Sequence, residues 1–599
     1  MQKKSKWFCL GIILLSVIMM LYYGNRKEGY HVDEMYSYGL ANSEYLPFMH
    51  FGEGGYSVKD WMNEYGAGEN LPQLVSNLIK DFGILKENGW HIKESPIYEA
   101  YLIAQENSAD TKTTTWMSGQ AYKDYLGASK SNMFNYASVY YNQRGDVHPP
   151  FYYMLLHTIS SVFQGTFSKW YGLSINILFL VMTMLLFYTL IEKYMGGYKV
   201  ALATIAVYGF SQGCLTNAMY IRMYAVLTFF VVFMCYVHIK IREEGFKLRG
   251  INRKLLIAAT FLGYYTHYYF VLYAMAIAFA FCVWVVYKKQ WRTLVSYILT
   301  MGITAACGLI IWPFAVKHVF GGYRGQESFG NLANSAAYLI KIKIVLERTV
   351  EQILGAHWYI WLILALVLFV FVAIRYKRGN RMLGKFVLIF FPAIIYFCFV
   401  AQIVPFFVER YFLCTYPFIC LFVILSVWYA AGKLAEGKLF AKSIEGQEGC
   451  ANNKSVGELS TSGARFQLGM TLLAAVLILL ENNALMHKPE YLFLGGQETA
   501  KVPENTTCLY VLPDGTWNES AIDSYILAQC DRVAVVYEGN MFSLQDTYTY
   551  KEGDCVMVVV SKSLNADVVL ENAKQVLNVP YLPEKYREDG DAIRIYLSK

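Results

Sequence analysis

Long apolar segments recur along most of this chain, and short polar or basic stretches separate them. A helix needs about 20 mostly apolar residues to cross the hydrocarbon core of a bilayer. Because most of the segments approach that length, the pattern predicts about eleven membrane crossings. The predicted spans lie near residues 7–23, 171–190, 198–216, 223–241, 255–269, 270–287, 293–314, 357–375, 385–403, 411–431 and 467–484.

Basic residues between the apolar segments set the direction of the predicted spans. Lys and Arg favour the cytoplasmic side of a membrane. The most basic connections are the initial MQKKSK and residues 238–254, 287–292 and 374–385. Placing all four in the cytoplasm puts the amino terminus inside. An odd number of crossings then puts the carboxyl terminus outside the cell membrane.

One apolar segment does not fit a full crossing. Residues 148–163, HPPFYYMLLHTISSVF, have helical character but are short. A crossing there would move residues 238–254 to the outer side, against their charge. We therefore expect this segment to be interfacial or partly inserted. If it does cross, one neighbouring span does not.

Three regions are expected outside the bundle, on the outer side. Residues 24–147 form a long first loop, and residues 317–356 form a second loop whose apolar spacing suits a helix lying on the bilayer. The third region is residues 486–599. There the apolar runs TCLYVLP, RVAVVYE and DCVMVVVS alternate with helical stretches near 518–529 and 564–577, which predicts a small α/β domain.

The expected fold class is a polytopic α-helical membrane protein with a small extracytoplasmic α/β domain at its carboxyl end. The first transmembrane helix occupies 1–23, and the outer loop 24–147 precedes a multi-span module at 148–431. Residues 432–466 are polar and patternless over most of their length, so we expect a disordered cytoplasmic loop. The last transmembrane helix then occupies 467–485, and the α/β domain 486–599.

Composition supports a membrane protein and excludes some other classes. Of the 599 residues, 56% are hydrophobic and 16% are charged, whereas soluble domains carry about 25% charged residues. The net charge of +7 is concentrated in short connections, so it indicates topology and not nucleic-acid binding. The twelve cysteines show no metal-ligand spacing. One disulfide among Cys508, Cys530 and Cys555 is left open.

Chemically capable residues gather at the predicted outer ends of several spans. The first outer loop begins with HVDEMYSY and ends with DVHPPFYY, and three further motifs, IRMYA, YTHYYF and ERYF, lie at outer junctions. The topology was assigned from charge alone, yet it puts all five motifs on one side at similar depth. Their candidate residues are Asp33, Glu34, Asp146, His148, Arg222, Tyr224, His267, Arg410 and Tyr411.

Each candidate also has a structural interpretation when it is taken alone. The acidic pair suits ordinary solvated residues that follow a helix, and His148-Pro-Pro suits the first turn of a helix. A single interfacial arginine more often reaches toward lipid headgroups, and a histidine among aromatic residues is more often a packed, hydrogen-bonded side chain. The case for function therefore depends on the set and not on any one member.

Together these motifs resemble the landmarks of the GT-C superfamily of membrane glycosyltransferases, in its protein O-mannosyltransferase-like and aminoarabinose-transferase-like branch. The resemblance covers roughly residues 7–430, and the acidic pair and the His-Pro-Pro are its most specific parts. It implies a GT-C-like fold. It also implies inverting transfer of a sugar from a polyprenyl-phosphate lipid donor to an acceptor on the outer face.

The resemblance assigns roles to the candidate residues. An attacking hydroxyl must lose a proton, so Asp33 is the first candidate for general base, with Glu34, Asp146 and His148 as further catalytic candidates. Donor phosphate binding falls to Arg222, Tyr224, His267, Arg410 and Tyr411, since arginine donors suit a phosphate. A divalent cation on His148, His267 or Glu34 is an open alternative.

Two other classes of function stay open. A transporter or lipid flippase for cell-envelope precursors should carry polar residues near mid-membrane, whereas the predicted spans are nearly free of charge in their middles. A non-catalytic assembly protein would work through the carboxyl-terminal domain. The sugar is also open, as is the acceptor, which is a cell-wall polymer, a lipid or a secreted protein.

Overall fold

The computed structural model describes most of the chain. The residues described are 2–49, 65, 71–88, 95–96, 98–100, 116–321, 323–333, 338–375, 381–444, 461–482, 489–493, 502–513, 516, 518–548, 550–551, 554–579, 584–589 and 593–598.

The chain is a multi-pass membrane protein. Among the described residues, eight helices are long and apolar enough to cross a bilayer. They lie in α1 (Gln2–Arg26), α9 (Lys169–Tyr194), α12 (Tyr224–Glu243), α14 (Phe270–Tyr287), α15 (Trp291–Ile311), α20 (Arg381–Ile403), η3 with α21 (Glu409–Thr415 and Tyr416–Ile444) and α22 (Thr461–Asn482). A bent pair, α18 (Tyr338–Leu354) and α19 (Trp358–Arg375), gives a ninth candidate.

The expected count of eleven crossings is too high by this measure. The segment 198–216 is broken into α10 (Gly197–Gly209) and α11 (Gln212–Met219), because Ser211 caps α11 by accepting a hydrogen bond from the Cys214 N–H at 3.1 Å. The segment 255–269 forms α13 (Ile251–Thr266), which has 16 residues and extends about 24 Å. Both are shorter than the hydrocarbon core, which is about 30 Å thick.

The segment at 148–163 is short, as its sequence indicates, while its expected interfacial position stays a prediction. It forms α8 (Phe151–Val162), a helix of 12 residues that extends about 18 Å and is too short to cross. The chain forms two compact units, and the boundary between them passes through α8 and α9. Unit 1 comprises residues 1–27, 147–152 and 172–492, and unit 2 comprises 28–146, 153–171 and 493–599.

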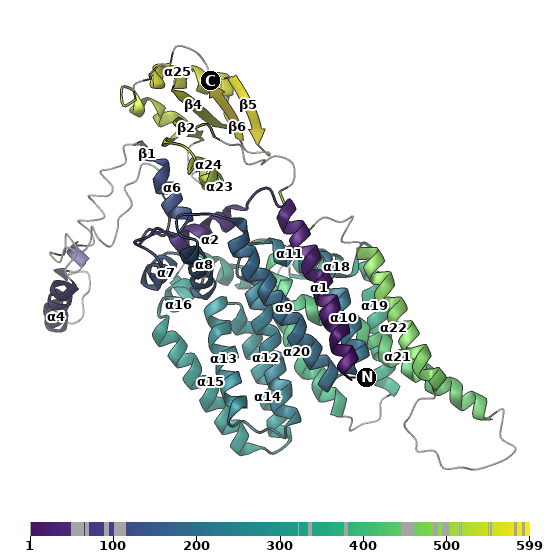
Figure 1. The fold of residues 1–599 in the computed structure, drawn as a ribbon. Coiled ribbons are helices and arrows are strands. Elements are labelled where there is room, and N and C mark those ends of the chain that lie inside the picture. The colour runs from purple at the N-terminus through teal and green to yellow at the C-terminus, as the bar shows by residue number, and fades with distance from the viewer. Residues whose placement is uncertain are drawn as a thin grey trace. The chain divides into compact units, whose positions relative to one another are not determined.

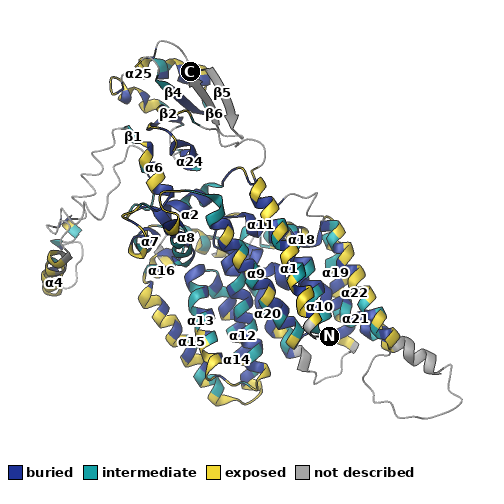
Figure 2. Ribbon diagram, in the orientation of Figure 1, coloured by how far each residue is buried: buried dark blue, intermediate teal, exposed yellow. Residues whose placement is uncertain are grey.

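Unit 1 is the helical bundle. Within the apolar part of α12, 78% of residues are buried, against 22% in α15, so α12 is central and α15 is peripheral (Figure 2). The break between α11 and α12 is fastened to α9. The Asn176 side-chain amide donates to the carbonyls of Ala218 and Tyr220 at 3.2 and 2.6 Å. A Cβ at Gly172 would lie 2.0 Å from Ile221 Cγ2, so glycine allows α9 to approach this break closely.

The predicted helix in residues 317–356 forms α18, which meets α19 at 90°. Such a bend suits a broken span or a re-entrant segment as well as a helix lying on the bilayer. α17 (Tyr323–Ala333) precedes α18. The predicted disordered loop at 432–466 is wrong at both ends, because α21 continues to Ile444 and α22 begins at Thr461. Residues 445–460 lie outside the described part of the chain.

Unit 2 contains a six-stranded sheet with the order β1-β3-β2-β4-β6-β5 (Figure 1). The predicted buried strands are confirmed as β2 (Thr506–Leu512), β3 (Arg532–Tyr537) and β4 (Cys555–Ser561), which are parallel. The predicted helices are confirmed as α23 (Asn518–Ile522), α24 (Ser524–Leu527) and α25 (Ala566–Leu577). β6 (Ile593–Ser598) pairs antiparallel with β4, and β5 (Glu584–Asp589) pairs antiparallel with β6. Cys508, Cys530 and Cys555 are free thiols.

The first outer loop is part of this second unit and not a separate region. Its strand β1 (Met117–Ser118) pairs antiparallel with β3, and α6 (Gly119–Leu126) follows directly. A Cβ at Gly119 would lie 1.8 Å from the Cys530 carbonyl oxygen, so the two segments meet backbone to backbone. α2 (Val32–Asn42) packs against α6, α7 (Tyr136–Arg144) and α23. The loop and the tail therefore share one folded unit.

Candidate functional site

Three segments of unit 1 meet at Arg222. This arginine lies in the break between α11 and α12, His148 precedes the Pro149-Pro150 pair that leads into α8, and His267 ends α13. Arg222 Nη2 lies 3.4 Å from His148 Nδ1. The rings of His148 and His267 are 5.5 Å apart, centroid to centroid. We call Arg222, His148 and His267 the basic cluster.

A hydrogen bond assigns the proton of the His267 ring. His267 Nδ1 accepts the Tyr269 N–H at 3.0 Å, so the neutral ring carries its proton on Nε2. His267 is 5% exposed, and no described residue bonds its buried Nε2. His148 Nδ1 lies beside the Arg222 guanidinium.

The electrostatics of the basic cluster favour an anion. Burial lowers the pKa of His267 well below its usual value, and the neighbouring His148 and Arg222 lower it further. The imidazole is therefore neutral and acts as an N–H donor. Arg222 is 5% exposed, so the cluster holds a guanidinium and imidazole donors with little solvent. Such donors suit phosphate or carboxylate oxygens.

Arg410, at the start of η3, belongs to an aromatic group beside this cluster. Its Nη1 donates to the Tyr220 hydroxyl at 2.7 Å, and its guanidinium carbon lies 5.3 Å from the centre of the Tyr411 ring. Tyr224 links the two parts, because its ring is 5.7 Å from His267 and 6.2 Å from Tyr411. All five residues predicted for donor phosphate binding are thus brought into one connected group.

Two carboxyl groups in the surroundings of Arg410, those of Glu409 and Glu490, are not among the residues predicted from the sequence. Tyr491 stacks on Tyr220 at 3.9 Å, and its hydroxyl donates to Glu409 Oε1 at 3.2 Å. Glu490 Oε1 accepts from the Gln352 side-chain amide at 2.8 Å. Glu490 has an exposed surface, yet partial burial and the adjacent Glu409 carboxyl raise its pKa to about 8. The ERYF motif contains Glu409, but no local pattern distinguishes Glu490.

The acidic pair lies in unit 2, and its two carboxyl groups have different surroundings. Glu34 is fully buried, and its Oε2 accepts the His31 N–H at 2.7 Å, which completes a capping box for α2. The Asp33 side chain is 29% exposed. Its backbone N–H, and not its carboxylate, takes part in the cap by donating to His31 Nδ1 at 3.1 Å. Glu34 is therefore a structural cap, and the Asp33 carboxylate is accessible.

Asp146 also belongs to unit 2. It follows the end of α7, and its Oδ2 accepts from the Tyr153 hydroxyl at 3.2 Å. Only Val147 separates Asp146 from His148, which belongs to unit 1.

The described residues contain no group of three or more His, Cys, Asp or Glu side chains that could hold a metal ion. Each of the three candidate ligands already interacts with another group. Glu34 is committed to the cap of α2, and His148 and His267 share their cluster with Arg222, whose charge opposes a cation. These engagements disfavour a divalent cation at the three candidates.

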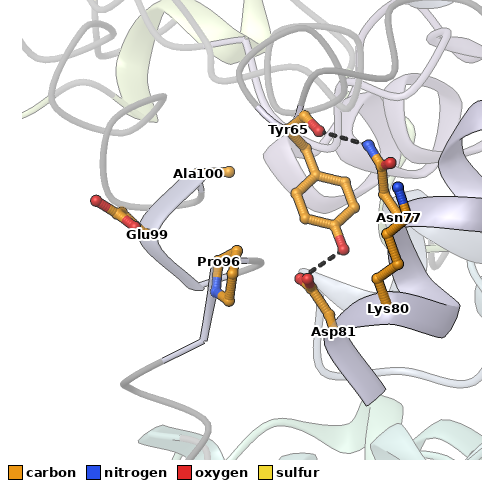
Figure 3. A pocket seen from close by; sticks show the side chains of 7 residues that line it. All are labelled: Tyr65, Asn77, Lys80, Asp81, Pro96, Glu99 and Ala100. Atoms are coloured by element: carbon orange, nitrogen blue, oxygen red, sulfur yellow. Dashed lines mark hydrogen bonds between the residues drawn. The ribbon is translucent and has the colours of Figure 1, made fainter. Parts of the chain in front are cut away.

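A small surface pocket occurs elsewhere in unit 2, beside α4 (Leu71–Glu87), with a volume of about 270 Å³ (Figure 3). Tyr65 stands in its wall, donating from its hydroxyl to Asp81 and accepting from the Asn77 amide at its carbonyl (2.5 and 2.9 Å). None of the predicted site residues lines it. Its polar groups bond within the wall, so we assign it no part in the candidate site.

Comparisons with known proteins give a distant structural likeness. No protein-family model matches the chain, and no curated protein matches its sequence. The fold is similar to that of ArnT from Cupriavidus metallidurans bound to undecaprenyl phosphate, with 12% identity, a TM-score of 0.39 and coverage of 75% of this chain and 87% of ArnT. The apo ArnT structure matches with 11% identity, a TM-score of 0.39 and coverage of 80% and 93%.

Proposed function

We propose that this protein is an integral membrane glycosyltransferase that moves a sugar from a polyprenyl-phosphate donor to a hydroxyl acceptor on the outer face. The observation that carries the proposal is the basic cluster. A buried guanidinium beside two imidazole rings, of which His267 is neutral, supports an anion site at the ends of the helices, where a lipid phosphate would be held. The sugar-lipid class of the donor comes from the resemblance of the sequence motifs to GT-C enzymes.

In this proposal the protein binds the donor through its phosphate, and the polyprenyl phosphate is also the leaving group. As the bond between the anomeric carbon and the phosphate oxygen breaks, negative charge grows on the phosphate. Fixed donors at that position stabilise the transition state more than the ground state. Arg222 and the His267 Nε2–H would supply them, together with the adjoining His148 ring and with Arg410 from the aromatic group.

The acceptor is activated by a carboxylate. Its oxygen forms a new bond to the anomeric carbon on the face opposite the phosphate, so the configuration inverts. The hydroxyl proton passes to Asp33, and the polyprenyl phosphate leaves with the electron pair of the broken bond. Asp33 suits this role better than Glu34, because a general base must reach its substrate and Glu34 is buried in a cap. Asp146 is the second candidate.

The test is sugar release from a panel of radiolabelled polyprenyl-phosphate sugars by the full-length protein in detergent, with membrane extract as the acceptor source. We expect the wild type to release label and Asp33→Asn to lose about 10²-fold or more of that rate. Asp124→Asn, an exposed aspartate on α6, is the control and should retain the rate.

Two outcomes would contradict parts of the proposal. Equal turnover by wild type and Asp33→Asn would make Asp33 structural and leave Asp146 as the candidate base. Absence of wild-type release from every donor, together with no binding of undecaprenyl phosphate, would overturn the glycosyltransferase function itself.

A further inference from the structure

An unusual residue caps the helix that carries the candidate base. Ser, Thr, Asp and Asn are preferred at helix N-caps because their short side chains reach the free N–H groups of the first turn. α2 instead begins with His31, whose backbone is extended at φ −81° and ψ 149° and whose Nδ1 accepts the Asp33 N–H at 3.1 Å. An imidazole thus replaces the usual hydroxyl or carboxylate.

This hydrogen bond requires a particular protonation state of His31. An acceptor Nδ1 has a lone pair, so the ring is neutral with its proton on Nε2. The same Nδ1 lies 3.6 Å from Asp33 Oδ2. One ring nitrogen therefore adjoins both the backbone N–H and the carboxylate of the same residue.

A second proton on the ring would reverse these contacts. A protonated Nδ1 cannot accept the Asp33 N–H, because two donors would then face each other. It can donate to Asp33 Oδ2 after a movement of less than 1 Å, forming an ion pair. Protonation would weaken the cap and place a positive charge on the carboxylate that must accept a proton.

We propose that His31 is a positioning residue for Asp33: its neutral ring fixes the first turn of α2, and its protonation ties up the Asp33 carboxylate. The inference rests on the proposed function, since it concerns the same candidate base. The inference predicts that activity falls at acidic pH because His31 is protonated as well as Asp33. An uncharged His31 does not compete for the carboxylate with a charged donor.

Among the described residues of α2, α6 and α7, the other charged side chains lie in the cap or are exposed. On α2 itself, Glu34 bonds the His31 N–H. On α6, Lys123 and Asp124 are exposed, and Asp124 accepts a hydrogen bond from Gln120 at 2.9 Å. On α7, Arg144 is exposed and stacks over Tyr141 at 4.3 Å. The tyrosines on α6 that carry hydroxyls buried against this region, Tyr122 and Tyr125, have raised pKa values and stay neutral.

Two substitutions of His31 separate the cap from the titration. Asn is a good N-cap whose Oδ1 can accept the Asp33 N–H, and it does not titrate, so His31→Asn keeps the cap alone. His31→Ala removes both. Ser118→Ala is the matched control, because Ser118 caps neighbouring α6 in the same way by accepting the Gln120 N–H at 3.2 Å.

The first measurement is the pH dependence of kcat/KM for sugar release. We expect His31→Asn to lie within about threefold of wild type at pH 8, with its acid limb moved about one pH unit lower, because only Asp33 then titrates. His31→Ala should lose about tenfold at every pH as the first turn frays, and Ser118→Ala about twofold or less. Coincident acid limbs for wild type and His31→Asn at equal thermal stability would overturn the inference.

A second measurement keeps the inference testable if no donor is turned over. The protein labelled with ¹³C-histidine is titrated by NMR, and the His31 signal is identified by its absence in His31→Asn. Asp33→Asn should lower the His31 midpoint, because the carboxylate that stabilises the protonated ring is gone. A midpoint that does not move would overturn the coupling. An inactive wild type with a moving midpoint would count against the proposed function and leave the coupling standing.

Discussion

The acidic pair and the basic cluster are built in opposite ways. Asp33 and Glu34 are neighbours in sequence, and their surroundings are set within one turn of one helix, where His31 and Glu34 cap α2. The basic cluster joins residues from three distant segments, and each of these residues lies at a helix end or a helix break. One site is local and the other depends on the tertiary fold.

This difference teaches where sequence position identifies a role and where it misleads. Adjacency suggests that Asp33 and Glu34 act alike, yet one is accessible and the other is a buried cap. Distance along the chain suggests that His148, Arg222 and His267 are unrelated, yet they lie together in the basic cluster. Substitutions in the acidic pair and in the basic cluster should therefore affect different measured properties, and by different amounts.

The largest expected effect comes from the two adjacent carboxyl groups. Asp33→Asn should reduce kcat by about 10²- to 10⁴-fold without changing the melting temperature, because the proposed general base is lost and the cap is intact. Glu34→Ala should instead lower the free energy of unfolding by about 1 kcal/mol, since the capping box is broken. Sugar release and thermal unfolding in detergent measure both. A large loss of kcat in a fully folded Glu34→Gln variant would contradict this division of roles.

The next effect tests the basic cluster. Arg222→Lys keeps the charge but loses the planar fork of donors, so the affinity for undecaprenyl phosphate should fall about 10- to 100-fold. Binding is followed by the thermal shift that the lipid produces. Arg253→Lys is the control, since this exposed arginine donates to the Leu248 carbonyl and the Ser296 hydroxyl away from the cluster. Equal affinities for wild type and Arg222→Lys would show that the basic cluster does not bind the donor phosphate.

Much of the architecture could be predicted because it follows from local patterns. The buried strands of unit 2 and α25 were readable from apolar runs bounded by polar residues. Most spans were readable from hydropathy. The exceptions have local causes: Ser211 caps α11 and breaks one predicted span, and His267 ends α13 after 16 residues. A hydropathy window averages over such breaks and cannot detect them.

The parts that could not be predicted depend on contacts between distant segments. The pairing of β1 with β3 joins the first outer loop to the tail, although nothing at Met117–Ser118 signals a strand partner more than 400 residues away. Glu490 is likewise significant only because Glu409 and Gln352 adjoin it. The resemblance to GT-C motifs did identify Arg222, His267 and Arg410, and the structure brings these three into one connected group.

A smaller effect should follow from Tyr220→Phe. The ring would keep its stack between Tyr224 and Tyr491, while the hydroxyl that accepts from Arg410 Nη1 is lost. One lost hydrogen bond to a charged group is worth about 1.5 kcal/mol or more, so the KM for the donor should rise about tenfold with little change in kcat. Tyr188→Phe is the control, because it removes a buried hydroxyl that bonds Ser5 elsewhere in unit 1. A fall in kcat at constant KM would place Arg410 at the transition state instead.

The smallest effect concerns the pH dependence of stability. The pKa of Glu490 is raised to about 8, so between about pH 5 and pH 8 the folded protein holds a proton that the unfolded chain releases. This proton stabilises the folded state fully at pH values below the pKa of the Glu490 carboxyl in the unfolded chain. The stabilisation is lost as the pH rises through about 8. The melting temperature of the wild type should therefore fall from pH 6 to pH 9, and Glu490→Gln should show a flatter profile over that window. If the melting temperatures of wild type and Glu490→Gln changed with pH in parallel, Glu409 and Glu490 would not share a proton. Their carboxyl groups would then interact too weakly to fix the position of Tyr491 beside Tyr220.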